Sequence, residues 1–282
     1  MASRKEKMTA AEGRGVGVMD PRPTLFSRDE KSLVGYLPAG FPTVDDSVRA
    51  LVAMAESGCD ALEVGLPYTD PVMDGPAIQT ASTTALRNGV RTEDVLRTVE
   101  QVAAKTDVPI LVMTYWNPIE QYGVERFAAG LSDAGGAGCV LPDLPVQHAG
   151  PWREAADKRE LASVFIAAPS STDQRLAAIA RASTGFVYAA STLGVTGMRS
   201  EVSGAELVAR IRQVTELPVL VGLGVSDGRQ AAEVAGFADG VIVGSAIVRR
   251  MLDAPDTATG IAEIRALCGE LADGTRRLVG GP

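Results

Sequence analysis

Short apolar segments recur along the chain from residue 32 onward and alternate with amphipathic segments of helical periodicity. Each apolar segment is hydrophobic on both faces, which is typical of strands buried in a parallel sheet. Eight such strands are predicted, starting at Ser32 (SLVGYLP), Ala61 (ALEVG), Pro109 (PILVMT), Gly138 (GCVL), Ser163 (SVFIAA), Phe186 (FVYAA), Val219 (VLVG) and Gly240 (GVIVG). Strand-then-helix units in this number predict an α/β fold, a (β/α)8 TIM barrel. A doubly wound open sheet is the rival fold, and it is less favoured because no Gly-x-Gly-x-x-Gly follows the first strand.

The predicted helices fill the stretches between these strands. Thr43 and Asp46 form a capping-box start for the first of them. Further helices are expected to follow Gly75, to cover TEDVLRTVEQVAAKT, and to begin near Val124, Gly150, Asp173, Gly204, Gly228 and Ile261.

The barrel is predicted to occupy residues 27–282 as a single domain, because no linker or change of composition interrupts that part of the sequence. Residues 1–26 are small, charged and aperiodic, which predicts a flexible N-terminal tail. With three cysteines, no secretory leader and no apolar run of about 18 residues, the predicted localisation is cytoplasmic. The net charge of −8 argues against nucleic acid and anionic membrane as partners.

Glu63 interrupts an otherwise apolar strand. Side chains alternate faces along a strand, so Leu62 and Val64 would face the helices while Glu63 faces the barrel axis. A buried carboxyl responds with a raised pKa, and near neutrality such a group acts first as an acid and then as a base. The alternatives are that Glu63 faces outward or pairs with a basic side chain.

The loop after that strand, residues 66–76, holds three prolines and the two aspartates Asp70 and Asp74. Loops at the carboxyl ends of barrel strands carry catalytic groups. Asp74 stands just before Gly75 and Pro76, so it fits a catalytic role or a cap of the following helix equally well.

Glycines follow the last three strands, in STLGVTG after residue 190, GLGVS after residue 221 and GSA after residue 243. In TIM barrels the loops after strands seven and eight, with a helix N-terminus, often bind phosphate. No Lys or Arg occurs in these segments, so backbone N–H groups would hold the anion. The alternative is that the glycines only serve tight turns.

Other side chains point to no further chemistry. Tyr188 is either a core tyrosine or a group that orients a substrate. One histidine, His148, cannot build a metal site, and no P-loop, dinucleotide fingerprint or metal-ligand spacing occurs. Neither a metal nor a cofactor is therefore expected.

Several motifs together make the chain resemble the tryptophan synthase α subunit family over roughly the whole barrel. They are LEVGLPYTDPVMDGPAIQ (62–79), FVYAASTLGVTG (186–197), YLPAGFPT (36–43), MTYWNP (113–118), PDLPV (142–146), VGLGV (221–225) and VGSAIV (243–248).

The resemblance implies roles for named residues. Glu63 and Asp74 match the family's catalytic carboxylates, and Tyr188 matches its active-site tyrosine. The substrate phosphate would be bound at Gly197, Gly224, Gly244 and Ser245. An indole pocket would be lined by Tyr36, Met113, Val140, Ile166 and Ile242. Partner contact would involve Pro67, Asp70, Pro71 and Asp143. Two residues depart from the family pattern: Phe41 replaces an acidic residue, and Thr192 replaces an arginine found in some members.

The activity implied by the resemblance is a lyase reaction, the retro-aldol cleavage of indole-3-glycerol phosphate to indole and glyceraldehyde 3-phosphate. Indole would pass to a β subunit, with an α2β2 heterotetramer as the expected assembly. The alternatives are a stand-alone lyase that releases free indole and a non-catalytic barrel that activates a partner. Another phosphate-binding barrel enzyme is disfavoured, because catalytic lysines or metal-ligand histidines do not follow the strands.

Overall fold

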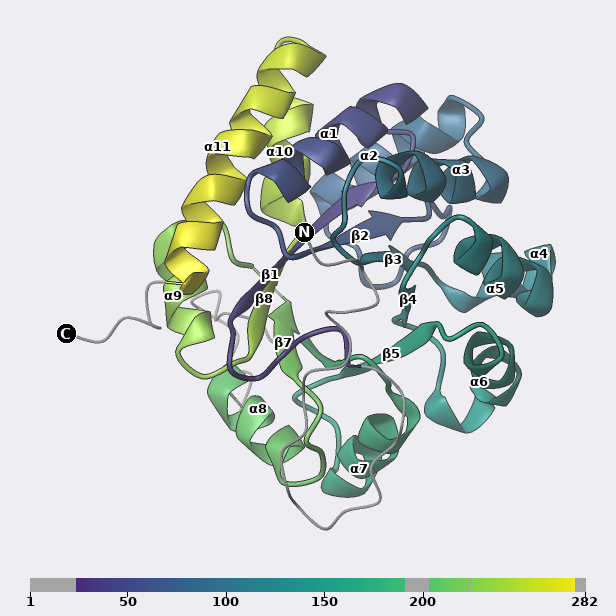
Figure 1. Cartoon of the computed structure of the whole chain (residues 1–282), viewed down its shortest axis with the longest axis vertical. Helices are drawn as coiled ribbons and strands as arrows, with labels where there is room; N and C mark the ends of the chain where they lie inside the picture. The colour runs from purple at the N-terminus through teal and green to yellow at the C-terminus, as the bar shows by residue number, and fades with distance from the viewer. Residues whose placement is uncertain (1–23, 191–202, 223, 277–282) are drawn as a thin grey trace.

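The computed structural model describes residues 24–190, 203–222 and 224–276. These residues form a closed barrel of eight parallel strands that follow one another in chain order, and β8 pairs with β1 to close the sheet (Figure 1). The strands are β1 (Ser32–Pro38), β2 (Ala61–Gly65), β3 (Ile110–Met113), β4 (Gly138–Leu141), β5 (Ala162–Ala167), β6 (Val187–Ala190), β7 (Val219–Gly222) and β8 (Gly240–Val243). The predicted (β/α)8 TIM barrel is confirmed.

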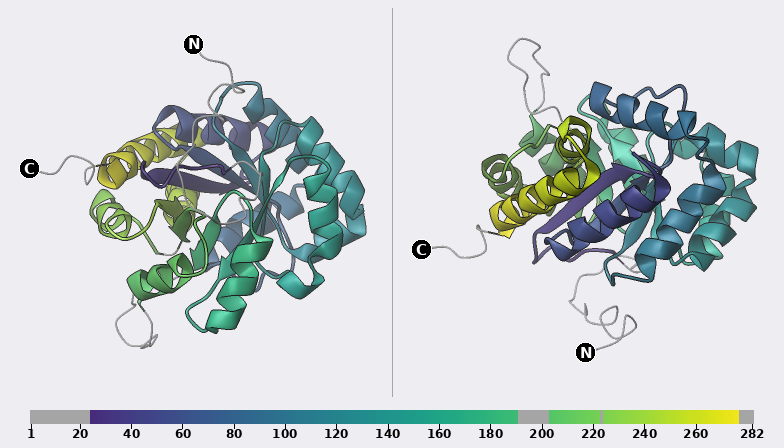
Figure 2. Two further views of the ribbon diagram at one scale, coloured as in Figure 1. Left: turned by 60° about the horizontal axis from the view of Figure 1, so that its bottom comes forward. Right: turned by 90° about the horizontal axis from the view of Figure 1, so that it is seen from above.

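Helices surround the barrel on its outside (Figures 1 and 2). They are α1 (Val44–Glu56), α2 (Pro76–Arg87), α3 (Thr92–Ala103), α4 (Trp116–Tyr122), α5 (Val124–Asp133), the short 3-10 helix η1 (Val146–His148), α6 (Gly150–Asp157), α7 (Asp173–Ala182), α8 (Gly204–Arg212), α9 (Gly228–Ala235), α10 (Ser245–Asp253) and α11 (Thr257–Arg276). Helix α11 lies beside α1, α9 and α10, so the last described helix packs against the first one.

Local sequence signals explain most of these boundaries. The Thr43 side chain accepts a hydrogen bond from the Asp46 N–H, which begins α1 as its capping residues predict. Helix α11 starts at Thr257, four residues before the predicted Ile261. No periodic pattern predicts α4, whose seven residues are WNPIEQY.

The inside of the barrel is filled by a separate apolar cluster, distinct from the layer between strands and helices. Its buried members are Phe26, Val34, Ala61, Leu111, Val140, Val164, Phe186, Leu220 and Ile242. The Phe26 ring meets the Phe186 ring edge-on at 5.4 Å between centroids. Phe26, placed at the end of the predicted tail, is therefore part of the barrel interior, whereas tail residues 1–23 lie outside the described residues.

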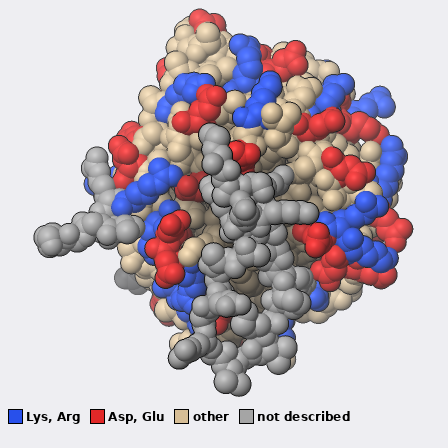
Figure 3. Space-filling view, in the orientation of Figure 1, with Lys and Arg blue, Asp and Glu red and all other residues tan. Residues whose placement is uncertain are grey.

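The surface shows no concentration of one charge in the view of Figure 3, where Lys and Arg are interspersed with Asp and Glu. Of the helices that the structure describes, none is both long and apolar enough to cross a membrane.

Candidate active site

Glu63 lies inside the barrel, as the alternation of β2 predicts. It stands in register with Tyr36 of β1, and its side chain is only 1% exposed. Ala61, two residues earlier on β2, belongs to the apolar cluster inside the barrel, whereas Leu62 and Val64 pack in the layer between strands and helices, so Glu63 shares the inward face. Glu63 Oε1 has no hydrogen-bond partner among the described residues. Burial raises the pKa of Glu63 from 4.5 to about 8.

Two tyrosine hydroxyls flank this carboxyl. The hydroxyl of Tyr36 lies against Gly65, and that of Tyr188 lies against Gly222, so a Cβ at either glycine would overlap a phenol. Burial raises the pKa of both tyrosines, and the nearby Glu63 charge adds to the rise in each. Both phenols are therefore neutral groups that can donate a hydrogen bond into the same space.

Asp74 does not cap the following helix. The N-cap of α2 is Gly75, without a side-chain hydrogen bond, so the capping alternative is wrong. The Asp74 carboxylate instead shares a hydrogen bond with the Tyr115 hydroxyl. Burial raises the pKa of Asp74, and this hydrogen bond opposes the rise. The pKa of Tyr36, the residue in register with Glu63, is raised by burial and further by the Asp74 charge.

Tyr115 is a site residue that the sequence did not reveal. It follows β3 and is 4% exposed. Its hydroxyl accepts a hydrogen bond from the Met73 N–H at 3.0 Å, which ties the loop after β3 to the loop after β2. Its place in MTYWNP, directly after a strand, was the one available signal.

The predicted phosphate-binding residues lie at the ends of β7 and β8. Gly224 has a φ of +73°, which favours glycine. Gly244 is the N-cap of α10 and provides no side-chain acceptor, whereas Asp227 caps the neighbouring helix α9. The N–H groups at the start of α10 are thus without a side-chain cap. A Cβ at Gly75 would lie 3.6 Å from Ser245 Oγ, so this turn adjoins the Asp74 loop. Gly197 and Thr192 lie outside the described residues.

The residues predicted to line an apolar pocket share the barrel interior. Val140 and Ile242 belong to the interior cluster, and the partly exposed Met113 and Ile166 pack against it. Tyr36 packs between Gly65 and Gly244. Phe41, the departure from the family pattern, is 4% exposed and packs in the layer between strands and helices.

The predicted partner-contact residues differ in exposure. Asp70 is exposed and Pro71 partly so, and Val72 beside them is 76% exposed. Pro67 is buried and lines a hollow of about 270 Å³ next to α2, α3 and α4. Asp143 is exposed, and its Oδ1 accepts a hydrogen bond from the Trp116 N–H at 2.8 Å, at the start of α4.

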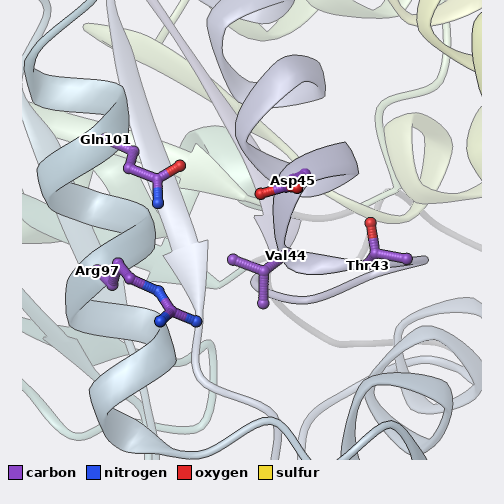
Figure 4. A pocket seen from close by; sticks show the side chains of 5 residues that line it. All are labelled: Thr43, Val44, Asp45, Arg97 and Gln101. Carbon is purple, nitrogen blue, oxygen red and sulfur yellow. The ribbon is translucent and has the colours of Figure 1, made fainter.

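A larger hollow of about 510 Å³ lies on the outside of the barrel, between the start of α1 and the side of α3 (Figure 4). Its wall includes Thr43, Asp45 and Arg97, which are exposed, and Arg97 already pairs with Asp94 at 2.7 Å. None of the predicted site residues lines it. Among the His, Cys, Asp and Glu side chains of the described ranges, no three gather as a metal ion would need.

Comparisons with known proteins agree on one family. The family model for "Tryptophan synthase alpha chain" matches residues 24–276. The tryptophan synthase alpha chain of Streptomyces avermitilis is 59% identical over 265 residues, covering 93% of this chain and 96% of the relative. A structure of Mycobacterium tuberculosis tryptophan synthase has 50% identity and a TM-score of 0.80, covering 88% of this chain and 94% of the matched one. A mutant alpha-subunit structure from Pyrococcus furiosus has 34% identity and a TM-score of 0.78, covering 85% and 97%.

Proposed function

The chain belongs to the tryptophan synthase alpha chain family, and we propose that its barrel cleaves indole-3-glycerol phosphate to indole and glyceraldehyde 3-phosphate. The observation that carries this proposal is the carboxyl of Glu63, which is buried inside the barrel with a pKa raised to about 8 and whose Oε1 has no hydrogen-bond partner among the described residues. At neutral pH this group holds a proton that it can give away, and after giving it the group is a base.

Glu63 supplies the proton that the reaction needs. The bond between the indole ring and the glycerol chain breaks only after the ring carbon C3 has gained a proton, which Glu63 donates. The resulting Glu63 carboxylate then removes the proton from the hydroxyl next to the scissile bond. As that C–O bond becomes the aldehyde carbonyl, the C–C bond between the ring and the glycerol chain breaks. The electron pair of the broken C–C bond returns to the ring and restores its aromaticity. Each proton transfer accounts for about 10²–10⁴-fold in rate.

Asp74 stabilises the charge that forms in between. Protonation at C3 leaves the ring nitrogen positive, and the Asp74 carboxylate accepts the N–H hydrogen bond from it. Tyr188, whose hydroxyl lies across the barrel from Glu63, orients the reacting groups. Met113, Val140, Ile166 and Ile242 supply apolar walls for the ring, together with Tyr36.

The phosphate is held at the other end of the substrate by Gly224, Gly244 and Ser245. The uncapped start of α10 offers N–H groups to an anion, and the helix dipole favours negative charge there. Because Ser245 adjoins the Asp74 loop, phosphate binding fixes the substrate close to both carboxyls.

We also propose that a tryptophan synthase β subunit receives the indole, with an α2β2 assembly. The exposed loop with Asp70, Pro71 and Val72 borders the Asp74 site, so docking there would cover the mouth through which indole leaves. The cytoplasm is the proposed location, in keeping with three free, buried cysteines in the described structure.

An indole-release assay on the isolated chain, with and without a β subunit, tests the proposal. We expect indole from indole-3-glycerol phosphate with the chain alone and a faster rate with the β subunit. A rate of indole release that is the same with and without the β subunit would favour the stand-alone lyase. No indole under either condition would overturn the proposed activity and favour the non-catalytic barrel.

A further inference from the structure

The Tyr115 hydroxyl occupies a position between two loops. It accepts the Met73 N–H at 3.0 Å and also shares a hydrogen bond with the Asp74 carboxylate. Met73 and Asp74 are consecutive residues of the loop after β2, while Tyr115 belongs to the segment that joins β3 to α4. A single phenol thus holds both the backbone and the side chain of this stretch.

The direction of these two hydrogen bonds follows from which of the groups can donate a proton and which can only accept one. A backbone N–H can only donate, so the Tyr115 oxygen is the acceptor toward Met73. An ionised carboxylate can only accept, so the one phenolic proton of Tyr115 points at Asp74. The hydroxyl oxygen accepts from the backbone at Met73 and Asp74, and its proton is available to the charged form of the Asp74 carboxyl.

The Tyr115 ring is itself held in place. It is 4% exposed, and the Tyr68 ring packs on it with 5.3 Å between centroids. The next residue, Trp116, donates its N–H to Asp143 at 2.8 Å, which anchors the backbone directly after Tyr115. The hydroxyl is therefore presented by a rigid support.

We propose that Tyr115 is a positioning residue that keeps the Asp74 carboxylate charged and directed at the substrate. This inference rests on the proposed function, in which Asp74 acts as an anion on the indole nitrogen.

Among the described residues around Asp74, Tyr115 is the group that stabilises the charged form of its carboxyl. The titratable groups that face the Asp74 region are Tyr36 from β1, Glu63 from β2 and Tyr115 from the loop after β3, with Tyr188 of β6 across the barrel. No Lys or Arg of the described residues forms an ion pair with Asp74 or lowers its pKa. Burial raises the pKa of Asp74, and within the described structure the Tyr115 hydroxyl is the group that opposes it.

The test compares Tyr115→Phe with Tyr68→Phe in the complete chain, using steady-state indole release across pH. Both variants lose one hydroxyl and keep the stacked rings, but the Tyr68 hydroxyl meets Asn117 at 3.4 Å instead of Asp74. For Tyr115→Phe we expect kcat to fall about 10- to 100-fold with KM changed less than about threefold. We also expect the acid limb of the kcat/KM profile to move to higher pH while the basic limb stays, because Asp74 then protonates more readily. Tyr68→Phe should leave both limbs in place.

Two further measurements make the result decisive. In an Asp74→Asn background, Tyr115→Phe should cost no additional kcat, because its effect passes through the carboxylate. Tyr115→3-fluorotyrosine keeps the hydroxyl as a stronger donor, so it should move the acid limb to lower pH and works even if the Phe variant folds poorly.

A Tyr115→Phe enzyme with wild-type kcat and an unmoved acid limb, or an unmoved limb in the fluorinated protein, would overturn the inference. If Asp74→Asn lowers kcat by about 10²-fold in the same experiment, the proposed function survives that failure. If the wild-type chain releases no indole, the proposed function itself has failed.

Discussion

Two buried carboxyls, Glu63 and Asp239, differ in everything except their burial. Asp239 precedes β8 at the amino-terminal end of the barrel and is 2% exposed. It accepts hydrogen bonds from Arg212 at 2.6 Å and from the Val219 N–H at 2.9 Å, and Arg28 lies 3.9 Å away. Glu63 is as deeply buried, yet its Oε1 has no partner among the described residues.

The difference separates a structural carboxyl from the one that we propose is reactive. Asp239 ties the N-terminal segment, α8 and β7 together, so its charge is compensated where it stands. Glu63 is fully buried, and its Oε1 finds no hydrogen-bond partner in the described part of the chain, so its raised pKa keeps the proton in place near neutral pH. The fold tolerates the free-energy cost of burying the Glu63 carboxyl because the ion pairs and the apolar interior of the barrel stabilise the folded state elsewhere.

The largest effect is expected from Glu63→Gln. The amide keeps the shape but neither donates nor removes the proton, so turnover should fall by about 10³-fold or more. Affinity for a phosphate-bearing substrate analogue should stay close to wild type, since the phosphate site is separate. Turnover within tenfold of wild type would refute the role of Glu63.

The same substitution should change stability in a pH-dependent way. The folded-state pKa of Glu63 is about 8 against 4.5 for a free carboxyl, so the unfolded chain loses this proton first. Wild-type stability therefore falls between about pH 4.5 and 8 by on the order of a few kcal/mol relative to Glu63→Gln. Urea unfolding of both proteins at pH 5 and pH 8 measures the gap. A gap that is equal at the two pH values would show that Glu63 is not held protonated.

Asp74→Asn is expected to have a smaller effect on turnover than Glu63→Gln. It keeps the shape of the side chain and removes the charge that we propose stabilises the ring nitrogen, so kcat should fall by about 10²-fold with little change in KM. Steady-state kinetics distinguishes the roles, because a rise in KM alone would make Asp74 a binding residue.

Asp239→Asn should lower stability and leave turnover unchanged, whereas Glu63→Gln and Asp74→Asn should lower turnover. It leaves Arg212 without its counter-charge and should lower the free energy of unfolding by about 2–3 kcal/mol. Turnover of the folded protein should be unchanged, as thermal unfolding and the lyase assay on one preparation would show. A loss of kcat in a fully folded variant would end the contrast between the two carboxyls.

Much of the fold was predictable because its signals are local. The strands are continuous apolar runs, and the alternation along β2 alone placed Glu63 inside the barrel. Helix α4 was missed because its seven residues are too short to show a period. Phe26 was assigned to the tail because its contact with Phe186 joins segments 160 residues apart, which no local pattern reports.

The site was predictable only in part for the same reason. Whether Asp74 caps α2 depends on which residue becomes the N-cap, and Gly75 takes that position. Tyr115 acquires its role from the meeting of two loops, so its spacing in the sequence carries no sign of Asp74.

Titration of the Glu63 carboxyl in the folded protein shows whether this group is protonated at neutral pH. Carbon-13 NMR of glutamate-labelled protein, with Glu63→Gln to assign the signal, follows the protonation of this one group. The account predicts a midpoint at about pH 8. A midpoint below about pH 5, as for a solvated glutamate, would contradict it.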